Sequence, residues 1–249
     1  MSTAAAPRSG DSALSEPSRI INVFIAPGKT FTDLRRNSSW WAPWLLISVT
    51  ALLFVYAVQM KVGLVQVVRN EIASNPRSEA QLSRLPANQR TERLQGIARF
   101  TQAVAYASPM TGLIAFVIIA AVLMASFNFG AGASIPFKTS LAVVTYGNLP
   151  TVIYSLLGIL SLAVGVNPEA FNIKNPVATN PAYFLNPTGN RFLYGMASAL
   201  DVFVLWTLIL MAVGYSVVSK LKRSTALAVI IGWYLVWKFV TSGLAALFS

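Results

Sequence analysis

Residues 40–60 read WWAPWLLISVTALLFVYAVQM, and this stretch decides the fold because it is apolar along nearly its whole length. A helix needs about 20 predominantly apolar residues to cross the hydrocarbon core of a bilayer. Four further stretches meet that requirement, at residues 107–127, 141–165, 196–218 and 226–248. They do not alternate between polar and apolar positions, which favours helices over a transmembrane barrel. The sequence therefore predicts an all-α fold, a polytopic membrane helical bundle with five transmembrane helices.

The composition excludes several classes of function. The chain has 249 residues and a formal net charge of +11, but its charged residues lie almost wholly between the apolar stretches. Basic residues placed there meet anionic lipid headgroups, so we expect the lipid bilayer as a partner and no nucleic acid. The chain contains no Cys and no His. It therefore lacks a thiolate nucleophile, an imidazole base and the usual zinc or haem ligands, and we expect no enzyme activity, cofactor or metal.

The chain divides into a tail and one membrane domain. Residues 1–18 are small and polar without an apolar core, which is typical of a disordered tail and not of a signal peptide. Residues 19–249 form the membrane domain, and its first part, residues 19–37, contains two short amphipathic pieces separated by Pro27. We interpret these pieces as an interfacial elbow that lies along the headgroups, with a helix tucked under the bundle as the alternative.

The connections between the spans also carry signals. Apolar residues recur at helical spacing beyond Lys61, which predicts that the first span protrudes as one helix as far as Asn75-Pro76 and that a helical hairpin leads into the second span. Four Asn-Pro pairs between spans three and four predict repeated turns. Residues 219–225 are too few for anything except a tight antiparallel connection between spans four and five.

The distribution of basic residues gives a preferred orientation. Each side of the membrane would carry nine of the 19 Lys and Arg residues, with Lys238 inside a span. The basic residues on the N-terminal side crowd into short segments, Arg35-Arg36 and Lys220 to Arg223. Short basic loops favour the cytoplasmic side. We expect the N-terminus inside.

Two ionisable residues fall within predicted spans, Asp201 in the fourth and Lys238 in the fifth. Each costs at least about 2.5 kcal/mol at the centre of an inserted helix, so such residues are candidates for function. Counted from the shared turn, they differ in depth by about 9 Å at 1.5 Å per residue, which a lysine side chain can largely bridge. Three hypotheses follow: a neutralised pair, an ion path that also uses Asn148, or a lysine that reaches to the interface.

Pro150 interrupts the predicted third span. Its ring removes the helical hydrogen bond to the carbonyl of Tyr146, so we expect a kink there. Tyr146, Asn148 and Pro150 thus join Asp201 and Lys238 as candidate intramembrane polar or structural residues.

The order of these features resembles the Yip family, five-span membrane proteins named for their interaction with small Ypt/Rab-type GTPases. The matching segments are Phe24-Ile-Ala-Pro27 to Phe31, Ser134-Ile-Pro-Phe-Lys138 with Leu141, Tyr146-Gly-Asn-Leu-Pro150, and Leu200-Asp-Val-Phe-Val-Leu-Trp206 with Gly214. The acidic Asp-Leu-Tyr-Gly-Pro segment of eukaryotic members is missing ahead of the spans, so the resemblance is to bacterial members.

The resemblance implies a non-enzymatic integral membrane protein that organises membrane or partner proteins, in a bacterial cytoplasmic (inner) membrane. It names no protein partner and no oligomeric state. The alternative hypothesis is a small transporter or channel with a polar path at Asp201 and Lys238.

Overall fold

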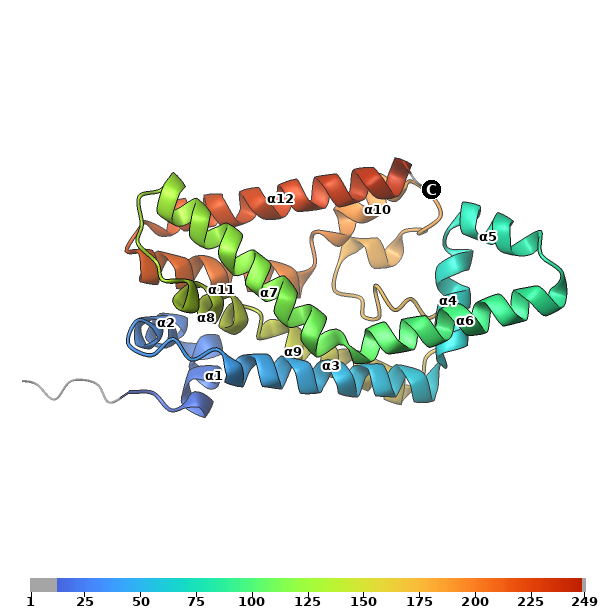
Figure 1. Ribbon diagram of the computed structural model, residues 1–249, viewed down its shortest axis with the longest axis horizontal. Helices are drawn as coiled ribbons and strands as arrows, with labels where there is room; N and C mark the ends of the chain where they lie inside the picture. The colour runs from blue at the N-terminus through green and yellow to red at the C-terminus, as the bar shows by residue number, and fades with distance from the viewer. Residues whose placement is uncertain (1–12, 248–249) are drawn as a thin grey trace, which may run out of the picture.

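The computed structural model describes residues 13–247, which form helices, turns and loops with no strand among them (Figure 1). Five helical segments are long and apolar enough to cross a bilayer, which confirms the predicted all-α, five-span bundle. These are α3 (Trp41–Lys61), α7 (Ser108–Ala125) extended by the π-helical turn η1 (Ser126–Gly130), α8 (Phe137–Gly147) followed by α9 (Pro150–Val164), α11 (Val202–Ser219) and α12 (Arg223–Leu247).

The other helices gather at the two ends of the bundle (Figure 1). At the end where α3 begins, the elbow consists of α1 (Glu16–Ile25) and α2 (Pro27–Leu34). At the opposite end, an arm projects beyond the spans and consists of α4 (Leu64–Ala73), α5 (Pro76–Ser83) and α6 (Ala87–Tyr106). The same end holds a long loop with the short helix η2 (Pro181–Phe184) and then α10 (Arg191–Ser198).

The helix α11 forms the centre of the bundle. In its apolar window 44% of the residues are buried, compared with 17% for α7 and 11% for α12, so the latter two offer most of their surface to lipid. The ring of Tyr215 on α11 stacks on Phe127 at 4.6 Å between ring centroids. Its hydroxyl shares a hydrogen bond with Ser140 of α8. Tyr215 and Ser140 thus satisfy each other inside the bundle, as a low-dielectric interior requires.

The elbow is docked against the bundle. Val23, Phe31 and Leu34 are fully buried, while Ile21 and Ile25 on the opposite face of α1 are 57% and 77% exposed. A β-carbon on Gly214 of α11 would lie only 2.6 Å from Val143 and 2.8 Å from the ring of Phe31. The elbow thus packs against the bundle, and Gly214 lets Phe31 approach the α11 backbone.

The kink predicted at Pro150 is confirmed. The helix α8 ends at Gly147 and α9 begins at Pro150. The backbone N–H of Leu149 donates to the carbonyl of Tyr146 at 3.2 Å, so this carbonyl finds a partner in a tighter turn. The side-chain amide of Asn148 donates to the carbonyl of Val144 at 2.8 Å. The carbonyl that Pro150 releases is thus satisfied locally, and the Asn148 side chain adds a second bond to a carbonyl that already accepts from its own backbone N–H.

The first span does not continue as one helix beyond Lys61, and this prediction was wrong. The chain breaks at Gly63, which has a φ of +82°, and α4 leaves in a new direction (Figure 1). Glycine adopts this left-handed conformation without the steric cost that other residues meet. The end of α4 before Asn75-Pro76 and the helical hairpin of α5 and α6 agree with the sequence-based expectation.

The continuous apolar composition of residues 196–218 predicted that the fourth span begins at Met196, but in the structure this span begins at Val202. Residues 196–198 belong to α10, and the chain turns before α11 starts. Asp201 causes this break, because its carboxylate accepts hydrogen bonds from the backbone N–H groups of Phe203 and Val204 at 2.9 and 3.2 Å. Aspartate is among the residues that best cap a helix N-terminus in this way.

Candidate functional site

Asp201 is 6% exposed and its carboxylate is fully engaged. Besides the two backbone donors of α11, it accepts hydrogen bonds from the hydroxyl of Thr179 and from the side-chain amide of Asn180, the latter at 3.1 Å. Four donors therefore surround one carboxylate. Asp201 fixes the start of α11 and holds the Asn-Pro loop against it.

Lys238 lies within the span α12 and its ammonium donates to the hydroxyl of Ser198 at 3.0 Å. Asp201 and Lys238 form no ion pair, although they lie at the same end of the bundle. The physical reason is that α11 and the loop already occupy the carboxylate. The turn between α10 and α11 is instead joined to α12 by Tyr234, whose hydroxyl donates to the carbonyl of Ala199 at 2.9 Å.

The predicted ion path through Asp201, Lys238 and Asn148 is only partly assembled. A β-carbon on Gly195 would overlap Ser242, so α10 and α12 pack closely beside Lys238. Asn148 lies at the break between α8 and α9 and bonds to its own helix. Neither Asp201 nor Asn148 lines the two cavities at this end of the bundle.

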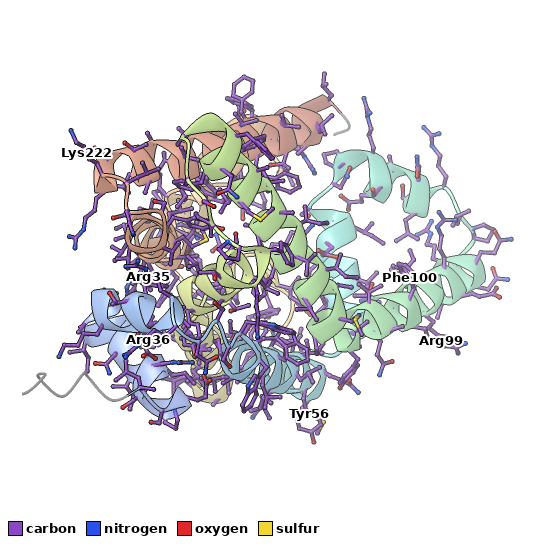
Figure 2. The ribbon with its side chains drawn as sticks, turned by 60° about the vertical axis from the view of Figure 1, so that its left-hand side comes forward. Arg35, Arg36, Tyr56, Arg99, Phe100 and Lys222 are labelled. Carbon is purple, nitrogen blue, oxygen red and sulfur yellow. The ribbon has the colours of Figure 1, made fainter. Side chains whose placement is uncertain are left out.

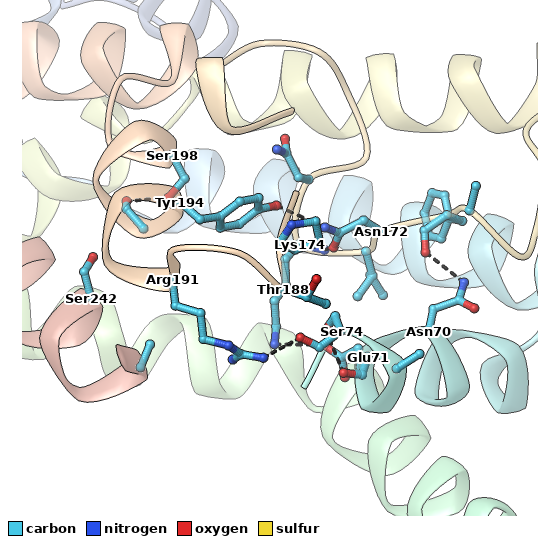
Figure 3. Close-up of a pocket in the computed structure, with 18 of the residues that line it drawn as sticks. Asn70, Glu71, Ser74, Asn172, Lys174, Thr188, Arg191, Tyr194, Ser198 and Ser242 are labelled. Atoms are coloured by element: carbon cyan, nitrogen blue, oxygen red, sulfur yellow. Dashed lines mark hydrogen bonds and ion pairs between the residues drawn. The ribbon is translucent and has the colours of Figure 1, made fainter. Parts of the chain in front are cut away.

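The larger cavity, of about 610 Å³, lies between α4, α10, α12 and the loop that follows α9. Figure 3 shows Arg191 extending from α10 across the cavity toward Ser74 of α4, whose carbonyl accepts a hydrogen bond from it. Lys174 of the loop pairs with Glu71 of α4 at 3.1 Å. Lys238 closes the wall formed by α12. The cavity thus combines charged groups with apolar walls and faces the end from which the arm projects (Figure 1).

A second polar cluster, which the sequence analysis missed, holds the elbow in place. Arg19 of α1 is 1% exposed and donates to Asp33 of α2 at 2.7 Å and to Glu16 at 3.1 Å. The hydroxyl of Tyr146 on α8 donates to the other oxygen of Glu16 at 2.6 Å. The candidate residue Tyr146 therefore connects this cluster to the kinked span.

The electrostatics of the elbow cluster favour the charged forms. Burial disfavours an ionised carboxylate, but the hydrogen bond and the charge of Arg19 outweigh it and hold the pKa of Asp33 below its usual value. Burial also opposes the charge on Arg19, and Asp33 and Glu16 reverse that effect and raise its pKa. The cluster is consequently an ion-pair network at neutral pH.

One signal in the sequence pointed to this network. Arg19 lies four residues before Val23, on the face of α1 that the apolar pattern assigns to the bundle. The tail boundary also changes, because α1 begins at Glu16, inside the segment 1–18 that the sequence assigned to a disordered tail. The part of that tail at residues 1–12 lies outside the described residues.

The described residues hold no group of three or more Asp or Glu side chains placed to bind a metal ion. Among their ionisable side chains, Asp201 caps α11 and Lys238 donates to Ser198, while Arg19 and its carboxylate partners hold the elbow. The chemistry available to them is the binding of charged or hydrogen-bonding groups.

A family model for the Yip1 domain matches residues 21–244. Comparisons with curated proteins and with solved structures gave no match. The matched region runs from the elbow through α12, and it contains all five spans and the arm. With this match, the five-span helical bundle belongs to the Yip1 domain family.

Proposed function

We propose that this protein is a non-enzymatic membrane protein of the Yip type that organises membrane or partner proteins through its arm. The observation that carries this proposal is the arm itself, which projects beyond the spans and has little cover from the rest of the described chain (Figure 1). The ionisable groups inside the bundle, in contrast, are held in structural contacts.

The arm has the features of a contact surface. Val68, Leu94 and Ala98 give it a small apolar core of its own, which keeps α4 and α6 together. Phe100 and Val104 of α6 remain 71% and 47% exposed, and both lie on one face of the helix. Exposed aromatic residues beside arginines are typical of protein contact sites. Figure 2 shows Arg99 and Phe100 pointing away from the bundle.

Photo-crosslinking in native membranes tests the proposal. A photoreactive amino acid at Phe100 should give discrete protein adducts. The matched control is Tyr56 of α3, which is 55% exposed on the lipid-facing part of the bundle and should give lipid adducts (Figure 2). The same adducts from both positions, or no protein adduct from Phe100, would contradict a role of the arm in partner binding.

We further propose a bacterial cytoplasmic membrane with the N-terminus inside. Arg35, Arg36 and Lys222 lie at the end of the bundle opposite the arm (Figure 2). Lys222 belongs to the tight connection between α11 and α12. Basic residues in short loops are retained in the cytoplasm. A C-terminal reporter that is active only in the cytoplasm should therefore be silent, and a strong signal would reverse the orientation.

The transporter hypothesis retains one supporting observation, the cavity that reaches Lys238 inside a span. A flux assay in proteoliposomes separates the two functions. Ion- or proton-dependent uptake that Lys238→Met abolishes would favour transport, and equal background flux in both proteins favours the organising role.

A further inference from the structure

Two cationic side chains line the cavity between α4, α10 and α12 without a carboxylate partner. Lys174, Arg191 and Lys238 are the cations among its lining residues, and Glu71 and Glu169 are the carboxylates. The one ion pair among these groups joins Lys174 to Glu71. Arg191 and Lys238 donate only to neutral oxygens, of Ser74 and Ser198. The cavity therefore presents two charges that its own walls do not neutralise.

Arg191 has unused donor capacity. Its guanidinium carries five N–H groups, and one nitrogen bonds to the carbonyl of Ser74. Its Nε atom is buried and has no hydrogen-bond partner among the described residues. A buried donor without a partner carries a free-energy penalty, which an anion bound to the guanidinium would relieve. Arginine binds planar carboxylates and phosphates through such pairs of N–H groups.

The position of the cavity indicates where the anion comes from. Lys238 lies nine residues before the end of α12, or about 14 Å along the axis, which places it in the half of the span near the arm. Trp237 and Val240, on the other side of the helix, are 66% and 49% exposed, so α12 borders lipid at this depth. The cavity, in the half of the span near the arm, therefore lies toward the membrane surface, where lipid headgroups gather. The volume of about 610 Å³ is within the range of about 300 to 1,000 Å³ that is typical of ligand sites.

We propose that this cavity binds a phosphate group, that of an anionic phospholipid, with Arg191 and Lys238 as its cationic ligands. The hydroxyl groups of Ser74 and Thr188 lie in the same wall (Figure 3) but already donate to the carbonyl of Glu71 and to the side chain of Asn186, so the two cations carry the binding. This site is distinct from the arm surface proposed to bind proteins. It would anchor a headgroup where α4, α10 and α12 meet.

The test is thermal stabilisation of the purified protein in a neutral detergent. Phosphatidylglycerol should raise the unfolding temperature of the wild type at concentrations at which phosphatidylcholine does not. In Arg191→Gln and in Lys238→Gln, the concentration of phosphatidylglycerol for half-maximal stabilisation should increase about tenfold or more, as expected for losing a charge-assisted hydrogen bond. Lys222→Gln, an exposed basic residue at the other end of the bundle, is the matched control and should respond like the wild type.

Further measurements distinguish a lipid from free phosphate as the ligand and exclude misfolding as the cause of a lost response. Inorganic phosphate that stabilises as well as phosphatidylglycerol would overturn the assignment to a lipid. If Arg191→Gln does not fold, Lys238→Gln and the charge-retaining Lys238→Arg carry the test, and Lys238→Arg should recover the preference for phosphatidylglycerol. An unchanged lipid preference in both neutral variants, or the same loss in Lys222→Gln, would overturn the proposed site.

Discussion

Breaking the ion pair between Arg19 and Asp33 should release the elbow from the bundle. Both side chains are almost completely buried, at 1% and 4% exposure, and the distance between them is 2.7 Å. Removal of one partner from a buried pair typically costs about 3 to 5 kcal/mol, because the other charge stays buried without compensation. Asp33→Asn leaves Arg19 with only Glu16 as a charged partner. We therefore expect a loss near the lower end of that range.

The chain offers a clean assay for this movement. It contains no Cys, so a single Val23→Cys substitution at a fully buried position of α1 provides one reactive thiol. A membrane-permeant maleimide should label it only when the elbow undocks. A change of about 3 kcal/mol corresponds to a factor of roughly 10² in the open population, so Asp33→Asn should increase the labelling rate by that order.

The matched control removes the other partner of the same carboxylate. Arg36 also contacts Asp33, at 3.0 Å, but its side chain is 55% exposed. Exposed pairs contribute only about 0 to 1 kcal/mol, so Arg36→Gln should change the labelling rate by less than about tenfold. Equal labelling rates in the Val23→Cys protein with and without Asp33→Asn would refute the view that the ion-pair network holds the elbow against the bundle.

Four further outcomes follow from the structure. Asp33 contributes stability above its ordinary pKa, and this contribution is lost as the pH falls through the lowered pKa of Asp33 in the folded protein. The unfolding temperature should therefore be constant near neutral pH and should decrease only below about pH 4. The decrease should be smaller in Asp33→Asn. A double-mutant cycle of Asp201→Asn and Lys238→Met, measured by thermal unfolding, should give a coupling well below the about 3 to 5 kcal/mol typical of a broken buried ion pair, since the two side chains make no direct contact; a coupling of that size would show that they form a pair. Gly214→Val should lower the free energy of unfolding by about 1 to 3 kcal/mol, because the added side chain overlaps Phe31. An unchanged unfolding temperature would show that Phe31 moves aside without cost. Deletion of residues 1–18 should leave membrane insertion unchanged but should speed labelling of the elbow, because it removes Glu16; loss of insertion would reveal a targeting role.

The spans could be predicted from the sequence because burial in lipid depends on local composition. The breaks could be predicted only where a backbone constraint is visible, as at Pro150. The break at Asp201 was missed because one carboxylate hardly changes the hydropathy of residues 196–218, although it satisfies two N–H groups at the start of α11. At Gly63, apolar periodicity on both sides concealed a change of direction.

The candidate site was less predictable, because its contacts are tertiary. Arg19 and Asp33 are 14 positions apart on separate helices, and no local pattern states that they meet. The sequence predicted that Asp201 and Lys238 differ in depth by about 9 Å. The partners of Asp201 depend on the Asn-Pro loop, whose path is set by side-chain hydrogen bonds such as that from Asn180. The cavity around Arg191 arises from four segments far apart in the sequence.

A charge reversal on the surface of the arm tests whether the arm binds a protein partner. With the photoreactive amino acid at Val104, Arg93→Glu and Arg99→Glu change two exposed residues of α6 that lie outside the bundle. If the arm binds a protein, the protein adducts should disappear while membrane insertion and the unfolding temperature stay unchanged. Adducts that persist unchanged after the reversal would contradict it.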